Sequence, residues 1–445
     1  MAGPSLDTLP VELLTEISSY LCAICCGTYP NSLSQKHLSR LSRTCRRLRD
    51  VCQPLLFDHY YHSSESMTRL LSFLRTLDAR PDLAKCVTSL DFHEPGYAEN
   101  LDDEDRQLVE SSIAKLGLPP LPAEWHDYLL ERRLLVAELV VASCPNIKVL
   151  RVPMNPEWTV SVIASLPKDV VFARLKKLDV WLFYVSGDHY AIKYGKISGL
   201  LHASPNLEHL RLPSIETFYP GEAEVPTLEK LTDLDLGEGA PPPYFLNCVL
   251  EACPNLQKFR LHWVDSDGYD EDSEEWSPLD GWRALQRVQS SVREIIFETN
   301  IEFPDDDNVE EGVSTLRDFA RLEILEVGGS ALQALHKVWA HHNRHASMEQ
   351  FVYQVFPSTI KELAIWDPDA SLIEVVRLLT RETAREQYPR LARINISRSE
   401  YLSGWRFDVA QWQEAVERRE FERSTIDLRI QLPTILDYPD ALYTF

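Results

Sequence analysis

Three stretches of the 445-residue chain share one pattern: LVVASCPNIKVLRV at residues 139–152, LLHASPNLEHLRL at 200–212 and VLEACPNLQKFRL at 249–261. Each begins with the apolar end of a helix, continues with a small residue and Pro-Asn, and closes with apolar-x-x-apolar-x-apolar. Proline stops a helix and asparagine favours a turn, so we expect the helix to end there. The closing alternation is typical of a short strand with one buried face. The three stretches therefore predict repeated helix–turn–strand units.

Weaker copies of the strand pattern occur along most of the chain. They are Val87/Leu90/Phe92, Leu175/Leu178/Val180, Leu231/Leu234/Leu236, Val292/Ile295/Phe297, Leu322/Leu325/Val327, Ile360/Leu363/Ile365 and Leu391/Ile394/Ile396. From Ile147 to Leu391 the pattern recurs at uneven intervals, each of which leaves room for a strand, a helix and a loop. This spacing is typical of a leucine-rich-repeat solenoid, in which parallel strands stack and line a concave face.

The expected fold class is therefore α/β, with N-terminal helices followed by an irregular leucine-rich-repeat solenoid of stacked parallel strands. Irregularity is expected because the asparagine that closes the strand turn occurs only at Asn155 and Asn300, and because the repeat lengths vary. The competing fold is a doubly wound α/β enzyme. We disfavour it because the chain contains no G-x-G-x-x-G or G-x-x-x-x-G-K-[ST] phosphate-binding loop.

The segment LPVELLTEISSYL at residues 9–21 predicts an amphipathic helix. Pro10 suits the first helical position, where no backbone N–H is needed, and Glu12 would then reach the free N–H groups of the first turn. One apolar face follows at helical spacing, and it is made of Leu13, Leu14, Ile17, Tyr20 and Leu21.

A second helix is predicted over residues 37–52, where apolar residues recur at spacings of three and four: Leu38, Leu41, Cys45, Leu48 and Cys52. Pro54 is expected to end this helix, because proline cannot continue the hydrogen-bond ladder. Two short helices in about 57 residues cannot bury much surface alone. We therefore expect this small helical module to need a partner.

These segments resemble the F-box. The residues LPVELL at 9–14, then Ile17 and Tyr20-Leu21, resemble its opening, and LSRTCRRLR at 41–49 followed by PLLF at 54–57 resembles its third-helix signature. Residues 22–37 form a longer connector than the family usually has, so the position of the middle helix stays open. The repeat region is similar to the leucine-rich-repeat half of F-box–LRR proteins.

The resemblance implies a function. An F-box docks on a Skp-family adaptor, which bridges to a cullin–RING ubiquitin ligase, so the chain would be a substrate-recognition subunit with no catalytic residues and no cofactor. The adaptor-binding residues implied are Leu9, Pro10, Glu12, Leu13, Leu14, Ile17, Tyr20, Leu21, Leu41, Cys45 and Leu48. Two alternatives stay open: a non-degradative F-box scaffold, and a metal-dependent enzyme.

Three regions are expected. Residues 5–57 form the F-box, residues 58–145 a helical connector with a first degenerate repeat, and residues 146–445 the irregular solenoid. Within the connector we predict helices over residues 102–116 and 124–141.

Charge and cysteine content restrict the partners and the compartment. The chain has 45 basic and 68 acidic residues, a net charge of −23, which argues against nucleic acid and anionic membranes as partners. Three acidic runs, at residues 99–105, 265–275 and 302–311, are expected to be solvated loops. Nine scattered cysteines favour a reducing compartment. With no secretory signal or long apolar stretch, we expect a cytoplasmic or nuclear protein.

Other reactive residues give weaker signals. His341, His342 and His345 form HHNRH, in which His341 and His345 could share a metal, although a zincin has Glu in the second position. Cys22, Cys25 and Cys26 lack the second paired cysteine motif of a zinc site, so we expect ordinary thiols and no metal. The sequon at Asn395 lies in a predicted strand and is expected to be unused.

The residues on the outward face of the strands are the candidate target-binding residues. Period-two alternation places aromatic and basic side chains on the concave surface, and these residue types dominate binding hot spots. The candidates are Trp181, Phe183, Arg211, Arg260, His262 and Trp366. The partner they would bind is a protein target whose identity the sequence leaves open.

Overall fold

The computed structural model describes nineteen segments of the chain. They are residues 9–21, 32–62, 67–92, 101–121, 125, 129–154, 161–167, 170–182, 192–213, 215, 224–237, 241–263, 278–299, 315–343, 347–367, 371–397, 411–412, 414–415 and 426–430. The protein is mixed α/β, as expected, and its paired strands are parallel. The chain divides into two compact units, residues 1–211 with 219–226, and residues 212–218 with 227–445.

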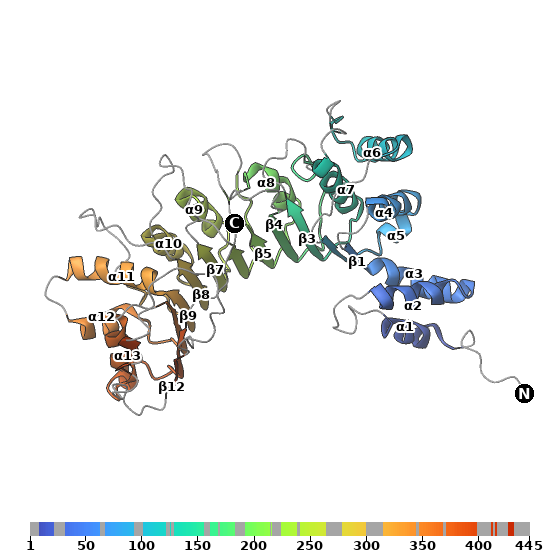
Figure 1. The fold of residues 1–445 in the computed structure, drawn as a ribbon. Coiled ribbons are helices and arrows are strands. Elements are labelled where there is room, and N and C mark those ends of the chain that lie inside the picture. The colour runs from blue at the N-terminus through green and yellow to red at the C-terminus, as the bar shows by residue number, and fades with distance from the viewer. Residues whose placement is uncertain are drawn as a thin grey trace, which may run out of the picture. The chain divides into compact units, whose positions relative to one another are not determined.

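The first unit opens with three helices, α1 (Val11–Ser19), α2 (Ser32–Ser42) and α3 (Arg46–Asp58) (Figure 1). Helix α3 packs against both α1 and α2. Among the described residues, Leu14, Leu48 and Val51 are buried together, and Leu9, Leu41 and Cys45 pack against them. Leu38 and Cys52 are buried as well. A module of this size buries only a limited core of its own.

The prediction of one helix over residues 37–52 is wrong, because the chain turns between α2 and α3. Cys45 is extended, with φ −154° and ψ 167°, and serves as the N-cap of α3. The hydroxyls of Ser42 and Thr44 donate to the backbone carbonyls three residues earlier, at 2.7 and 2.8 Å. Such local bonds compete with the helical ladder, which explains the break.

The prediction that Pro54 ends this helix is also wrong, since Pro54 lies inside α3, which continues to Asp58. Contacts beyond the proline hold the last turn in place: the Phe57 ring stacks on Phe73 at 5.6 Å, and the Asp58 carboxylate accepts a 2.6 Å hydrogen bond from Thr88. At the start of α1, Pro10 is the N-cap and not the first helical residue, and its carbonyl accepts from the Leu14 N–H at 3.1 Å.

The sheet of the first unit consists of strands that follow one another in chain order. They are β1 (His59–His62), β2 (Ser89–Phe92), β3 (Val149–Met154), β4 (Lys177–Leu182) and β5 (His209–Leu212). Each strand is parallel to the one before it. The helices of this part are α4 (Met67–Ala79), α5 (Pro81–Ala84), α6 (Asp103–Lys115), α7 (Leu129–Ser143) and α8 (Gly195–His202). Figure 1 shows α7 and α8 on one side of β3 to β5.

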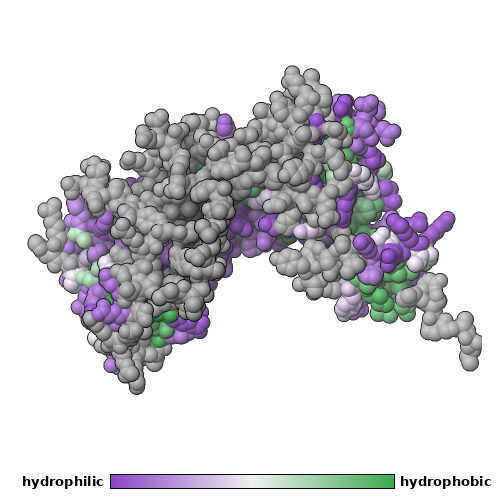
Figure 2. All heavy atoms as spheres, viewed as in Figure 1, coloured by the Kyte–Doolittle hydropathy of each residue, from purple (hydrophilic) through white to green (hydrophobic). Residues whose placement is uncertain are grey.

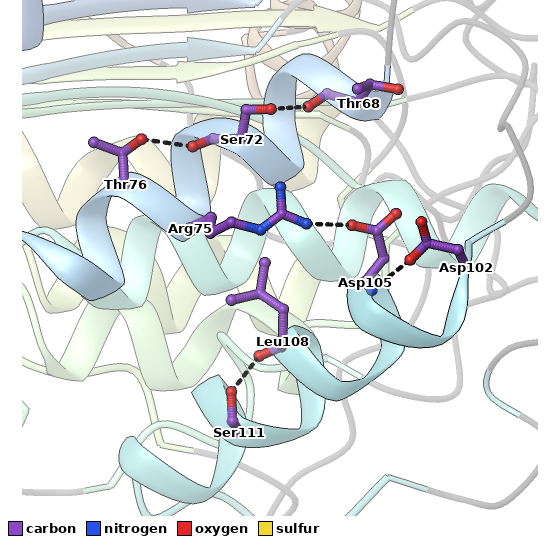
Figure 3. A network of polar contacts seen from close by, with 8 residues as sticks. All are labelled: Thr68, Ser72, Arg75, Thr76, Asp102, Asp105, Leu108 and Ser111. Carbon is purple, nitrogen blue, oxygen red and sulfur yellow. Dashed lines mark hydrogen bonds and ion pairs between the residues drawn. The ribbon is translucent and has the colours of Figure 1, made fainter.

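Both helices predicted in the connector are present, as α6 and α7, although residues 126–128 before α7 lie outside the described segments. The acidic residues 103–105 belong to the first turn of α6 and not to a loop, which corrects that part of the prediction. The Asp102 side chain caps the Asp105 N–H at 2.8 Å, and the helix dipole favours acids at this end. Arg75 of α4 binds the Asp105 carboxylate at 2.8 Å, which ties the two helices together (Figure 3).

The second unit repeats the same plan. Its strands are β6 (Asp233–Leu236), β7 (Lys258–Trp263), β8 (Glu294–Thr299), β9 (Ile324–Gly328), β10 (Glu362–Trp366), β11 (Arg393–Ser397) and β12 (Asp427–Ile430). They are parallel and adjacent in chain order. Its helices are α9 (Pro243–Glu251), α10 (Pro278–Leu285) with the 3₁₀ turn η2 (Gln286–Val288), α11 (Gly329–His342), α12 (Met348–Val355), α13 (Leu372–Thr380) and α14 (Ala384–Gln387).

All ten strands predicted from the apolar pattern are present, as β2 to β11. One face of the strands is buried under helices, and along most of them the other face keeps partial exposure: in β4, Leu178 and Val180 are buried, and Asp179 between them is partly exposed. Strand β8 differs, because both of its faces are buried. Figure 1 shows α9, α10 and α11 on one side of β7 to β9. Two strands, β1 and β12, were not predicted: β1 lacks the leucine pattern, and the segment of β12 has Thr425 where the pattern requires its first apolar residue.

The units repeat their backbone hydrogen bonds as well as their elements. Just before strands β2 to β4 and β6 to β10, one carbonyl accepts two consecutive N–H groups of the next repeat. Lys148 O, for example, lies 2.9 and 3.0 Å from the backbone N atoms of Lys176 and Lys177. In the second unit the Gln257 carbonyl accepts from residues 293 and 294 in the same way. This recurrence shows that the sequence repeats are structural repeats.

The asparagine of each Pro-Asn turn contacts the repeat before it. In all three turns the side-chain Nδ2 donates at 2.8 Å to a backbone carbonyl of the preceding repeat. The pairs are Asn146 with Lys85 O, Asn206 with Ala173 O, and Asn255 with Glu229 O. The sequence pattern predicted a turn, and these contacts show that the asparagine also links neighbouring repeats.

Candidate binding surfaces

Helix α1 and its C-cap carry four large apolar side chains that are exposed. Val11 is 48% exposed, Leu13 45%, Ile17 40% and Tyr20, the C-cap residue, 71%. Leu13, Ile17 and Tyr20 are spaced by four and three residues, so they lie along one stripe of the helix. Figure 2 shows hydrophobic surface gathered over these N-terminal helices. We call Leu13, Ile17 and Tyr20 the α1 face; Val11, two residues before Leu13, is exposed on another side of the helix.

The predicted adaptor-binding residues divide into two groups. Pro10, Glu12, Leu13, Ile17 and Tyr20 are exposed, whereas Leu14 and Leu48 are buried and Leu9, Leu21, Leu41 and Cys45 are partly buried. The second group mostly holds α1 against α3, so its contribution to a docking surface would be indirect. Val11, in the quoted LPVELL segment, is also exposed, but on another side of the helix from Leu13, Ile17 and Tyr20.

Two polar contacts fix how α1 sits on α3. The Arg47 guanidinium donates to the Leu9 carbonyl at 2.5 Å, which anchors the residue before the helix. At the other end of α1, the buried Ser18 hydroxyl lies 3.4 Å from the Cys52 thiol. The helix is therefore held along its length, and its exposed side is presented in a defined orientation.

The open face of the first unit's strands carries alternating charges. Asp91, Arg151, Asp179 and Arg211 follow one another in register across β2 to β5. Arg151 Nε lies 3.4 Å from Asp179 Oδ2, and the predicted target-binding residue Arg211 stands exposed at the end of this row. The row is a mixed-charge surface, suited to partners that carry both signs of charge.

Trp181, also predicted to bind the target, is held in place by the fold. Its Nε1 donates to the Phe92 carbonyl at the end of β2, at 3.1 Å, and its side chain is half-buried. The ring is therefore pre-ordered on the open face. Phe183 lies outside the described residues.

In the second unit, Arg260 and His262 both contact carboxylates of neighbouring strands. Arg260 lies 3.3 Å from Asp235, with which it is in register, and His262 Nδ1 lies 2.8 Å from Glu298. Glu298 is only 3% exposed, so the contact with His262 gives a buried side chain a polar partner. Both side chains therefore link neighbouring strands, in addition to any contact they make with a target.

The last predicted residue, Trp366, lines a pocket of about 200 Å³ on the same open face. Its other lining residues are Glu326, Ala364, Asn395, Ile396, Ser397 and Arg429, from strands β9 to β12. In register, Ala364 stands between Glu326 and Asn395, and Gly328 stands beside Trp366. The pocket exists because these small residues leave a hollow between larger neighbours.

Glu326 is the acidic group of this pocket. Burial raises the pKa of its carboxyl, and the nearby carboxylates of Glu294 and Glu362 act in the same direction. Arg260 and His262 lower the pKa but do not outweigh burial. Among the residues described, the Glu326 carboxylate has no hydrogen bond or ion pair.

Within the second unit, the predicted target-binding residues do not form one site. Arg260 and His262 lie on β7, whereas Trp366 lies on β10, with β8 and β9 between them. Of the predicted set only Trp366 reaches the pocket. The alternation rule could have identified Glu326, Asn395 and Arg429, because all three occupy outward positions of their strands.

The candidate metal residues are placed only in part. His341 and His342 are exposed at the end of α11, and His342 Nδ1 lies 2.9 Å from the Val338 carbonyl. His345, Cys22, Cys25 and Cys26 lie outside the described segments. The part of the chain that is described contains no group of three or more His, Cys, Asp or Glu residues that could hold a metal ion.

Asn395, the sequon residue, is in β11 and lines the pocket just described. Searched over the described residues, the helices include none with the length and apolar character needed to cross a membrane. Comparison of the chain with protein-family models and with curated proteins returns no match, so the functional argument depends on the surfaces above.

Proposed function

We propose that the chain is a substrate receptor of a Skp–cullin–F-box ubiquitin ligase. In this proposal α1 to α3 form an F-box that docks on a Skp-family adaptor. The repeats form an irregular leucine-rich-repeat solenoid, and its open strand face binds a protein target. The chain would act by proximity and not as an enzyme, since it would hold the target where a separately recruited conjugating enzyme can transfer ubiquitin.

The α1 face is the observation that carries the proposal. Its three apolar side chains are 40% to 71% exposed on a small helical module. Full burial of such a side chain stabilises by about 1.5–3 kcal/mol. An apolar groove on an adaptor would therefore gain substantially by covering the row, in the manner of a helix that docks in a groove.

The order of the modules supports the same assignment. The F-box resemblance covers residues 5–57, and the described part of that segment contains three packed helices, including α2, which begins in the stretch that the sequence left open. The parallel repeats follow in the same chain, with their outward residues accessible. An adaptor site and a target site on separate elements are what a bridging receptor requires.

The test is co-purification of the full chain with a Skp-family adaptor. Leu13→Ala/Ile17→Ala removes two side chains of the α1 face, and we expect at least a tenfold loss of adaptor capture. Val171→Ala/Tyr244→Ala is the matched control, because it removes two apolar side chains that are 49% and 48% exposed elsewhere. Equal capture by both variants would reject the F-box assignment. Adaptor capture without cullin would instead favour the non-degradative scaffold.

A further inference from the structure

We propose that the pocket on the open face of β9 to β12 binds an arginine side chain of the protein target. This inference rests on the proposed role of the open strand face as the target-binding surface. It goes beyond that role because it names the chemistry that one part of the target must carry.

The pocket presents three groups suited to a guanidinium. The Glu326 carboxylate lies on one side of Ala364, the Asn395 amide lies on the other, and the Trp366 ring belongs to the same lining. A carboxylate accepts two parallel N–H bonds from arginine, and an amide oxygen can accept a third. A guanidinium also stacks favourably on an indole face.

Glu326 is the group that selects for positive charge. It is partly buried and, within the described residues, lacks a hydrogen-bond or ion-pair partner, so a bound cation would satisfy it. Its neighbour Glu362, one strand along, is already paired with Arg393 at 3.0 Å. An ion pair formed in a partly desolvated pocket contributes more than an exposed one.

Arg429 at the pocket's edge does not turn the site into an anion site. Its guanidinium is engaged with Asp427, at 2.9 Å through Nε and 2.8 Å through Nη2. A phosphate or carboxylate entering the pocket would face the Glu326 carboxylate and be repelled by it, because Glu326 has no ion-pair partner among the described residues. The net charge of −23 also favours a basic segment over an acidic one.

Arginine suits the hollow better than lysine on geometric grounds. The floor is made by Ala364, whose methyl side chain leaves the width between β9 and β11 open for a flat group. Lysine would offer one point charge, whereas the planar guanidinium can contact Glu326 and Trp366 together.

The probe is a set of fluorescein-labelled nonapeptide pools with a fixed central residue and random flanks. The fixed residue is arginine, lysine, glutamate, or citrulline, which is the neutral isostere of arginine. Fluorescence polarisation is measured on the full chain co-expressed with its adaptor. We expect the arginine pool to bind at least about tenfold tighter than the citrulline pool, and the glutamate pool to bind weakest.

Two variants test the residues. Glu326→Gln should remove the preference for arginine over citrulline. Glu323→Gln is the matched control, because it removes the same charge from just before the same strand, outside the pocket, where Glu323 is paired with Lys361 at 2.8 Å. Trp366→Ala should weaken both the arginine and the lysine pools, and Trp366→Phe should recover part of the loss.

Three results would overturn the inference: no measurable binding of any pool, equal binding of the arginine and citrulline pools, or an arginine preference that survives Glu326→Gln. Failure here and failure of the proposed function are distinguishable. Adaptor capture depends on the α1 face, so it would persist if only the pocket assignment were wrong. An arginine preference without adaptor capture would leave the pocket in place and reject the ligase role.

Discussion

Leu13 and Leu14 are consecutive residues of α1 with opposite environments: Leu13 is 45% exposed, whereas Leu14 is 1% exposed and packs with Leu48 and Val51. The sequence pattern grouped both leucines on one adaptor-binding face. Their separation means that substitutions at the two positions should act by different physical routes.

Leu14→Ala should destabilise the α1–α3 module by about 2–5 kcal/mol, because it leaves a cavity in a small core. Leu13→Ala should change stability by less than about 0.5 kcal/mol and should reduce only adaptor capture. Hydrogen–deuterium exchange of α3 peptides measures the first effect locally. If Leu13→Ala accelerated exchange in α3 as much as Leu14→Ala, the α1 face would be part of the module's core.

Glu138 should make the first unit lose stability as pH rises. Its carboxyl is buried in α7, accepts from Ser161 and from the Ile163 N–H at 3.1 Å, and burial raises its pKa to about 8. The unfolded chain releases this proton near pH 4.5, whereas the folded chain keeps it up to about pH 8. Folding therefore binds a proton between these values, and stability falls across that window by roughly 1 kcal/mol per pH unit.

The measurement is urea denaturation of the parent and of Glu138→Gln at several pH values from 5 to 8. The variant should show a flatter profile, because its side chain does not titrate. Glu110→Gln, an exposed position on α6, is the control and should keep the parent's slope. Parallel profiles for the parent and Glu138→Gln would contradict the assignment.

Gly199 should resist substitution, since α8 packs closely on the turn before it. A Cβ at this position would lie 2.6 Å from the Ile163 carbonyl oxygen and 3.1 Å from that of Ala164. Gly199→Ala should therefore destabilise the first unit by about 1–3 kcal/mol through overpacking. Gly195→Ala, in the same helix with nothing within 4 Å, should be neutral or slightly stabilising. Thermal unfolding of both variants checks the contrast, which disappears if the turn can move aside.

Asn255 should contribute to the second unit through its link between repeats. Removing the 2.8 Å bond to the Glu229 carbonyl by Asn255→Ala should cost about 1 kcal/mol, measured by chemical denaturation. Asn255→Asp should cost at least as much, because a carboxylate cannot donate to that carbonyl. Gln257→Ala, at an exposed site two residues later, is expected to have no effect. If Asn255→Ala had the stability of the parent, the role of Asn255 would be confined to forming the turn.

The apolar periodicity predicted the ten strands β2 to β11 because each has a face buried under helices, and apolar residues recur on that face with the side-chain period. It failed between α2 and α3. There the apolar spacing continues through the turn, so the spacing alone predicts an unbroken helix. The chain turns because the hydroxyls of Ser42 and Thr44 bond to nearby backbone carbonyls, which the apolar pattern does not take into account. Pro54 was misjudged because packing of Phe57 on Phe73 lies outside local sequence.

The pocket could be predicted only in part. Alternation identified Trp366 as outward-facing, but a hollow depends on which small residues stand in register. Gly328 and Ala364 come from paired strands with α11 and α12 between them in the chain, and their register follows from the fold. Sequence reasoning also placed Trp181 and Trp366 on one surface, although they belong to different compact units.

The strand pairing of the second unit has a consequence for synthesis on the ribosome. Each strand pairs with its neighbours in chain order, as Asp233 of β6 does with Lys258 of β7 and Ile324 of β9 with Glu362 of β10, so partners are separated by a small part of the chain. Closing such short loops costs little entropy, and contacts of this range favour fast folding. Each strand therefore meets a neighbour that has already left the exit tunnel, and the unit can form in the order of translation, from β6 towards β12, without waiting for the C-terminus.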